Sequence, residues 1–347
     1  MQGRSAGERI EVDGAPRWLA EILAGALAPQ SPVDDPSRDP HREGVGVRVD
    51  VEPSRAPLPL GGCELITRGV WRAAPATALL ENACSAGFDL LVRAPEPDGE
   101  GCLTVTARYR PDLRTLAANR ALRQRFRLLA RQTLVQYPAL WRAGLRGGVP
   151  VHASAVVPAA PARSAGVLIV GPGGVGKSTL LLAETAAGGR AASDNLCVWQ
   201  EGVAYGVAEP LRVEGGAGRR TTNGRRERSL PGRLAAVRPD HVVLLRRDPA
   251  GRPGARPLPR GVAARALVAG TYAAGELRRY WQFAAVLALA TGAGPAHPPI
   301  AATAACIVSA LPCTEVSLRP GSRLAEAAGA FHPTAEVVRV NPSEVLP

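Results

Sequence analysis

Alternating apolar and polar positions predict short strands in the first part of the chain. In 103–109, Leu103, Val105 and Ala107 alternate with polar residues, which is the two-residue period of a strand that is buried on one face. Apolar runs at 63–67 and 89–93 have the length that is typical of strands.

A helix is predicted from about 113 to 136, where the apolar spacing changes. Leu122, Phe126 and Leu129 share one face of this helix. The arginines of the segment fall largely off that face, and we interpret them as solvated: Arg120, Arg123, Arg127 and Arg131. Pro138 should kink or end the helix, because proline lacks the backbone N–H that an α-helix needs.

We therefore expect residues 61–148 to form a small α+β domain. The segment before it is punctuated by prolines between 28 and 60, with acidic and arginine residues among them. This composition is typical of loops or partial disorder. We predict that 1–60 is a poorly ordered N-terminal segment with one short helix at 15–27.

After residue 148, apolar runs alternate with helical segments. Strands are expected at 151–157, 166–170, 241–245 and 315–318, and helices at 177–187, 274–290 and 301–311. This alternation is typical of an α/β layer structure. The sequence therefore predicts an α/β fold for 149–347.

The net charge of +12 raises nucleic acid as a partner, but the composition argues against it. Of the 42 basic residues, 41 are arginine, alongside abundant alanine, glycine and proline, which is typical of a coding bias and not of selection for charge. Only 4% of the residues are aromatic, so few could stack on bases. No apolar stretch reaches the roughly 20 residues of a membrane span, and no apolar leader is present. We expect a cytoplasmic protein with neither a nucleic-acid nor a membrane partner.

Lys177, the single lysine of the chain, lies in a segment that predicts a nucleotide site. Residues 171–178 fit the P-loop pattern G-x-x-x-x-G-K-[ST], with an apolar strand before them and a helical run after them. Glycines let successive backbone N–H groups face one anion at the start of a helix. We expect Lys177 to reach the β- and γ-phosphates of ATP and the Ser178 hydroxyl to bind Mg²⁺. The predicted nucleotide-binding residues are Gly171, Pro172, Gly173, Gly174, Val175, Gly176, Lys177, Ser178 and Thr179.

Asp194 is the first acidic residue after the strand that follows this helix. Beside the γ-phosphate it would orient Mg²⁺ or accept the proton of an incoming hydroxyl. The alternative is an aspartate that caps a turn. A GTPase is excluded, because its base-reading N-K-x-D motif needs a second lysine, and the signature segment of ABC-type ATPases is absent.

These features together resemble a known family. His152 and Ser154 on a strand, an apolar strand that leads into 171–178, and an acidic group seventeen residues after Lys177 are similar to the C-terminal catalytic domain of HPr kinase/phosphorylase. The shorter HPr-kinase-related proteins of bacterial gene clusters are more similar still. The resemblance covers about residues 149–248. It implies an HPr-kinase-like P-loop domain after a small α+β domain, with ATP as donor and a serine hydroxyl of a protein or peptide as acceptor. It also implies that Asp194 is the base and lies beside Mg²⁺, and that Ser178 is a Mg²⁺ ligand.

Two departures from the family change the expected site. The family has two adjacent aspartates, whereas here the second position is Asn195, an amide that can bind Mg²⁺ through its oxygen but carries no charge. The family's glutamate-arginine-glycine segment is replaced by an arginine-rich loop at 212–233. This loop is either a clamp on phosphate or on an acidic substrate, or a solvated loop. His152 either contacts phosphate, orients Asp194, or is satisfied inside the sheet.

The sequence thus predicts an ATP- and Mg-dependent kinase that acts on a hydroxyl of a peptide, a protein or a small metabolite. The expected catalytic residues are Asp194, Lys177 and His152, and the expected metal ligands are Ser178, Asp194 and Asn195. The alternative is a binding or assembly protein that uses ATP as a switch with little transferase activity. A homo-oligomer is compatible with either.

Overall fold

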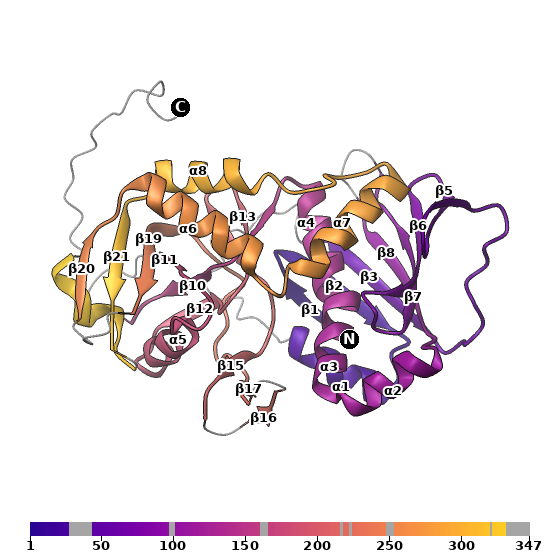
Figure 1. Ribbon diagram of the computed structural model, residues 1–347, viewed down its shortest axis with the longest axis horizontal. Helices are drawn as coiled ribbons and strands as arrows, with labels where there is room; N and C mark the ends of the chain where they lie inside the picture. Colours follow the sequence, from indigo (N-terminus) through magenta and orange to yellow (C-terminus); the bar gives the residue numbers. More distant parts are fainter. Residues whose placement is uncertain are drawn as a thin grey trace.

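The computed structural model describes residues 1–27, 44–96, 101–159, 166–215, 218–221, 224–247, 253–319 and 321–330. Over these residues the chain is a mixed α/β structure with four sheets. Figure 1 shows two halves side by side, with most of the early strands in one half and the later strands in the other.

The first half is built on an eight-stranded mixed sheet in the order β1-β2-β3-β8-β7-β6-β5-β4. The β2–β3 and β3–β8 pairs are parallel and the other neighbours are antiparallel. The strands are β1 (Gln2–Ser5), β2 (Glu8–Asp13), β3 (Val45–Glu52), β4 (Glu64–Thr67), β5 (Val70–Ala74), β6 (Thr77–Ala83), β7 (Phe88–Arg93) and β8 (Leu103–Tyr109).

The prediction that residues 1–60 form a poorly ordered segment is wrong for 1–13 and 45–52, whereas the short helix expected at 15–27 is confirmed by helical residues 17–26, and residues 53–60 contain no helix or strand. Strands β1, β2 and β3 lie there, and β3 is central to the sheet, where Val49 pairs with Val105 of β8. In β3, Val47 and Val49 are buried and Arg48 between them is exposed, so the alternation that identifies a strand is present in the sequence. The nearby prolines masked it. Residues 28–43, also expected to be a loop, lie outside the described residues.

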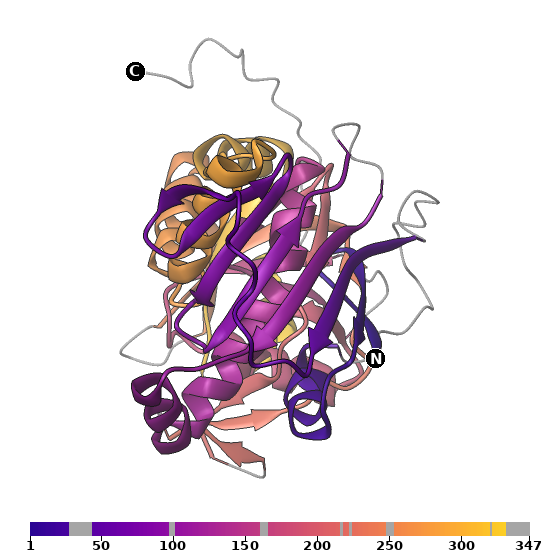
Figure 2. The ribbon, with the colours of Figure 1, turned by 90° about the vertical axis from the view of Figure 1, so that its right-hand side faces the viewer.

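Helices pack on one face of this sheet, and in Figure 2 the magenta helix at 137–145 lies behind the strands, while the shorter helices at 17–23 and 113–121 lie at their lower ends. They are α1 (Arg17–Leu23), η1 (Ala24–Ala26), α2 (Leu113–Ala121), α3 (Arg123–Arg131), η3 (Gln132–Gln136) and α4 (Tyr137–Leu145). The last three follow one another without a gap, and η3 is a π-helical turn. The helix predicted at 113–136 is therefore confirmed, with a break at Leu122. The π turn ends just before Pro138, whose missing N–H interrupts the regular α-helical ladder.

Arg131 corrects the expectation that the arginines of this segment are solvated. It is buried, donates from Nε to the main-chain oxygen of Ile22 at 2.9 Å, and forms two hydrogen bonds with Glu227 at 2.8 and 3.2 Å. It therefore joins the first half to a strand that belongs to the second.

The second half contains a six-stranded sheet in the order β12-β10-β11-β19-β21-β20. Its centre, β11-β19-β21, is parallel, and β10 and β20 run antiparallel to their neighbours. The strands are β10 (Ser154–Val157), β11 (Gly166–Val170), β12 (Arg190–Ser193), β19 (Pro239–Arg246), β20 (Gly254–Pro257) and β21 (Cys313–Ser317).

Helices lie on both faces of this second sheet (Figure 1). Val167 and Ile169 of β11 pack toward α5 (Lys177–Ala186), while Leu168 and Val170 pack toward α6 (Arg260–Ala273) and α8 (Ile300–Ala310). Burial on both faces explains the unbroken apolar run of β11. The final described element is η4 (Leu324–Ala330).

Two small sheets and one helix connect the halves. The sheet β18-β14-β13-β9 contains β9 (Val149–Val151), β13 (Cys197–Gln200), β14 (Val203–Gly206) and β18 (Ala236–Val237), and the sheet β15-β17-β16 contains β15 (Leu211–Val213), β16 (Arg219–Arg220) and β17 (Arg226–Arg228). Helix α7 (Arg278–Thr291) returns to the first half, where it contacts β5, β6 and α4. In the described part of the chain, no helix is both long and apolar enough to cross a membrane.

Candidate functional site

The loop between β11 and α5 has a conformation that requires glycine. Gly174 and Gly176 have positive φ angles of 78° and 114°, which side-chain-bearing residues rarely adopt. A Cβ atom added to Gly173 or Gly176 would meet nothing within 4 Å, so the backbone faces open space there. Because α5 begins at Lys177, free N–H groups at the start of this helix point into that space, which is the arrangement that binds a phosphate group.

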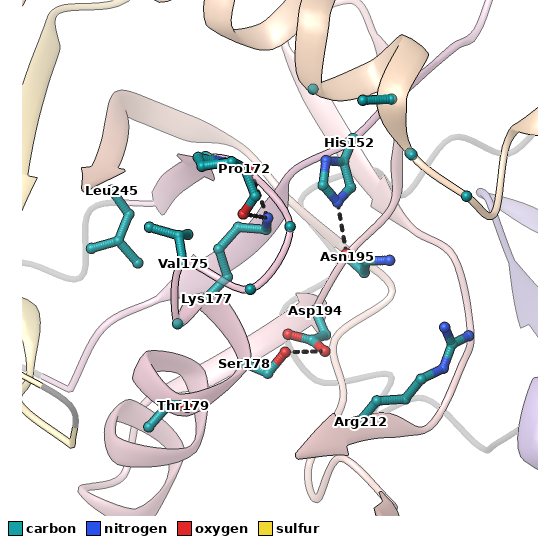
Figure 3. Close-up of a pocket in the computed structure, with 18 of the residues that line it drawn as sticks. His152, Pro172, Val175, Lys177, Ser178, Thr179, Asp194, Asn195, Arg212 and Leu245 are labelled. Carbon is teal, nitrogen blue, oxygen red and sulfur yellow. Dashed lines mark hydrogen bonds between the residues drawn. The ribbon is translucent and has the colours of Figure 1, made fainter. Parts of the chain in front are cut away.

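Lys177 is buried against the loop, with 6% of its surface exposed. Its Nζ donates to the main-chain oxygens of Gly171 at 2.8 Å and Pro172 at 3.3 Å, as Figure 3 shows. Burial lowers the pKa of Lys177 to about 8, although the carboxylate of Asp194 acts in the opposite direction. The ammonium is therefore mainly charged at neutral pH but poorly solvated, and a phosphate group would stabilise it.

Asp194 directly follows β12 and faces the start of α5. Its Oδ2 accepts a hydrogen bond from the Ser178 hydroxyl at 2.8 Å. The Ser154 hydroxyl donates to the main-chain oxygen of Asp194, which fixes the backbone of that residue. Burial raises the pKa of Asp194, and the bond from Ser178 opposes that rise.

The second carboxylate oxygen of Asp194 is a buried acceptor with no hydrogen-bond partner among the described residues. Such orphaned oxygens cost free energy unless a proton, water or cation satisfies them. Mg²⁺ is commonly held by one or two protein oxygens together with substrate phosphates and waters. Ser178 and Asp194 fit that pattern, so they could hold Mg²⁺ beside the loop.

Asn195 and His152 form a separate pair next to Asp194. The Nε2 of His152 lies 2.8 Å from Oδ1 of Asn195, and the backbone N–H of His152 donates to Thr271 Oγ1 at 3.0 Å. Burial lowers the pKa of His152, with the charge of Lys177 as a second cause, so the ring is neutral at neutral pH and Nε2 carries the donated proton. His152 therefore orients Asn195 and not Asp194 (Figure 3). The strand predicted at 151–157 is interrupted at this histidine, between β9 and β10.

All the predicted site residues line one cavity of about 880 Å³. The cavity is at the end of β11 where α5 begins, which is the usual position of ligand sites in open α/β sheets. Its volume is within the range of small-molecule pockets.

The opposite wall of this cavity was not anticipated from the sequence. Glu209, Arg212 and Glu276 line it, and Arg212 joins the two glutamates through hydrogen bonds of 3.1 and 2.7 Å. Glu209 is 4% exposed, its Oε1 has no partner among the described residues, and burial raises its pKa to about 7. Burial would also raise the pKa of Glu276, but Arg212 outweighs that effect and the pKa is lowered. Glu276 lies 64 residues after Arg212 in the chain, and only Arg212 fell inside a segment that the sequence singled out.

The arginine-rich segment 212–233 is not uniform, and its residues 216–217 and 222–223 lie outside the described part. Arg212 and Arg233 hold neighbouring segments together, with Arg233 donating to the main-chain oxygens of Val207 and Glu209. Arg219 and Arg220 of β16 are exposed. Arg225 lines the cavity. The segment is therefore partly structural, and two of its arginines, Arg212 and Arg225, line the cavity.

The sequence was compared with protein-family models and with curated proteins. No protein-family model matches the chain, and no curated protein matches it significantly. Among the described residues, no group of three or more histidine, cysteine, aspartate or glutamate side chains could hold a metal ion by itself. A metal in this cavity would therefore need ligands beyond those side chains, such as the Ser178 hydroxyl and a bound phosphate.

Proposed function

We propose that this protein is an ATP- and Mg²⁺-dependent kinase that transfers the γ-phosphoryl group of ATP to a hydroxyl of a peptide, a protein or a small metabolite. The observation that carries the proposal is the contact between Ser178 and Asp194 at the start of α5. It combines a hydroxyl, a buried carboxylate with one unsatisfied oxygen, and the adjacent ammonium of Lys177 in a single cavity.

In this proposal the glycine loop binds the triphosphate through its backbone N–H groups. Lys177 exchanges its hydrogen bonds to Gly171 and Pro172 for bonds to the β- and γ-phosphates. Ser178 and Asp194 would hold Mg²⁺, which would supply positive charge beside the phosphates. The residues thus position the donor and stabilise the charge that develops during transfer.

Asp194 is the proposed base. Burial raises the pKa of Asp194 in the metal-free site, which favours its accepting a proton, whereas a bound Mg²⁺ would act in the opposite direction. Asp194 would accept the proton of the acceptor hydroxyl. At the same time the oxygen of that hydroxyl would form a new bond to the γ-phosphorus of ATP. The bond from that phosphorus to the bridging oxygen breaks, and ADP leaves. The acceptor would enter between the glycine loop and the wall that contains Glu209 and Arg212.

The alternative is a nucleotide-dependent switch, and Asn195 is the observation that favours it. The position next to Asp194 is neutral, and its amide oxygen is engaged by His152. The site therefore has one carboxylate beside Ser178. That single carboxylate would suffice to bind Mg²⁺ and nucleotide, whereas a kinase also needs it to accept a proton.

The substitution Asp194→Asn separates the two functions. It keeps the side-chain shape and one oxygen for Mg²⁺ but removes the proton acceptor. For a kinase we expect MgATP affinity to change by only a few-fold, while transfer falls roughly 10²–10⁴-fold. Affinity is measured by calorimetry, and transfer by mass detection of phosphate from labelled ATP on acceptors encoded by neighbouring genes. Transfer at the wild-type rate would exclude Asp194 as the base and favour the switch.

A further inference from the structure

Arg225 brings a positive charge to the glycine loop in addition to Lys177 and to Arg247, whose Nε donates to the main-chain oxygen of Val175 at 3.4 Å. One of its terminal guanidinium nitrogens lies 3.9 Å from the position that a Cβ atom would take on Gly174. No other described heavy atom outside the loop neighbourhood comes within 4 Å of that position. Arg225 lines the same cavity as Lys177 and Ser178. Its guanidinium is therefore on the side of the loop where a bound triphosphate would lie.

Arg225 is weakly held by other protein groups. Within the described part of the chain its recorded ion pair is with Glu214, at 3.9 Å, and the Glu214 side chain is 87% exposed. An exposed pair at this distance contributes little stability and is readily exchanged for another anion. Two other arginines of the same segment have firmer partners: Arg212 bonds to Glu209 and Glu276, and Arg226 donates to the main-chain oxygen of Gly218 at 2.8 Å.

The strand that follows Arg225 is fixed by a buried ion pair. Glu227 of β17 lies two residues beyond Arg225 and accepts both hydrogen bonds from Arg131 of α3. The side chains of Arg131 and Glu227 are 5% and 13% exposed. Strand β17 also pairs with β15, next to the cavity wall. Arg225 therefore directly precedes a strand that is held in two places, by β15 and by Arg131. Of these two, Arg131 belongs to the first half of the molecule.

We propose that Arg225 is an arginine finger supplied in cis, which contacts the β- and γ-phosphates and stabilises the charge that develops on them during transfer. This inference rests on the proposed function of the same site. A guanidinium can form two parallel hydrogen bonds to phosphate oxygens, which a single ammonium cannot. Fingers of this kind accelerate phosphoryl transfer on the order of 10³-fold or more. The Arg131–Glu227 pair positions the finger.

Nucleotide binding tests the proposal without an identified acceptor. Calorimetry compares MgADP, MgATP, and MgADP with aluminium fluoride, which imitates the phosphoryl group in transit. We expect Arg225→Ala to keep MgADP affinity within about threefold, because the loop and Lys177 bind the diphosphate. Affinity for the aluminium fluoride complex should fall on the order of 10²-fold. Arg225→Lys should recover little of that loss.

Arg226→Ala is the matched control, because it removes an adjacent arginine that bonds to Gly218 and does not line the cavity. It should bind all three probes as the wild type does. Equal binding of the aluminium fluoride complex by the wild type and Arg225→Ala would overturn the finger while leaving the nucleotide site intact. Failure of the wild type to bind any of the probes would overturn both the finger and the proposed function.

Glu227→Gln tests the positioning role. It should weaken binding of the aluminium fluoride complex less than Arg225→Ala does, and it should add nothing when combined with Arg225→Ala. Unchanged MgADP affinity shows that the variant is folded. If the two substitutions have additive effects, Glu227 does not act through Arg225.

Discussion

The two walls of the cavity are built in different ways. The glycine-loop wall consists of consecutive residues, 171–178, whose backbone N–H groups and one lysine face the cavity. The opposite wall joins Glu209 and Arg212, which are three residues apart, to Glu276, 64 residues further on, and it uses side-chain ion pairs. The first wall needs only a strand, a glycine turn and a helix. The second depends on how the whole molecule is assembled.

This difference has an electrostatic counterpart. The loop wall is positive, through Lys177 and the start of α5. The opposite wall balances Arg212 against two carboxylates, one of which, Glu209, has a pKa of about 7 because burial disfavours its charge. A bound phosphate group would therefore balance the positive charge of the loop wall. In the opposite wall, protonation of Glu209 changes the charge. Substitutions in the two walls should therefore affect different properties.

The largest effect is expected at Lys177, in the loop wall. Lys177→Ala should reduce MgATP affinity roughly 10²-fold or more, because the single ammonium at the phosphates is lost. Lys177→Arg should also fail, since a longer planar guanidinium does not fit a position that is 6% exposed. Calorimetry measures the affinity, and an unchanged melting temperature shows that the fold is retained. Wild-type affinity in Lys177→Arg would contradict the role of the loop.

An effect on stability rather than on binding is expected at Glu209, in the opposite wall. Its pKa is near 4.5 in the unfolded chain and about 7 in the folded protein, so the folded state keeps a proton that the unfolded state loses. Between these values the free energy of unfolding should decrease as the pH rises, by about 3 kcal/mol in total. Glu209→Gln, which does not ionise, should remove this decrease.

Urea unfolding at pH 5, 6, 7 and 8 gives the free energy of unfolding of the wild type and of Glu209→Gln. The pH effect of Glu209 is the difference between these two free energies. That difference should grow up to about pH 7 and then level off. Glu214→Gln is the control, because it makes the same chemical change at a side chain that is 87% exposed. A difference for Glu209→Gln that does not change with pH would show that the two walls do not differ in this way.

The smallest effect is expected at Asn195, between the two walls. Asn195→Asp restores a second carboxylate beside Asp194, but the existing oxygen is directed at His152, 2.8 Å away. We expect Mg²⁺ to bind only several-fold more tightly in the presence of ATP, as an order-of-magnitude estimate from the added charge. Titration of Mg²⁺ at fixed ATP measures the change. A much larger gain would place residue 195 directly at the metal.

The loop wall could be predicted from the sequence because its information is local. The apolar run of β11, the glycines and Lys177 are contiguous in the sequence. They predict, in turn, the strand, the glycine turn and the start of the helix. Asp194 could also be found, since one strand separates it from α5. The same local reasoning gave β8 and α8 nearly at their observed bounds.

The opposite wall could not be predicted, because nothing local marks its members. Glu276 lies in the connection between α6 and α7, and its position depends on where α7 packs. Helix α6 itself was not anticipated, although Ala263, Leu267 and Thr271 are buried at four-residue spacing. Its alanine and glycine content gives a weak apolar signal. In β2 and β3 the alternating pattern was present, but the prolines around it outweighed it.

Helix α7 also determines whether the two halves of the molecule can be separated into fragments that fold independently. Phe283, Ala284 and Leu287 of this helix are buried in the cluster that contains the core of the first sheet, although they follow the second half in the chain. A fragment that ends near residue 148 would therefore lack part of its own core, and the remaining fragment would carry an apolar helix with nothing to cover. The two halves are interlocked, so a protease cut between them should leave fragments that stay associated and do not separate as independent modules.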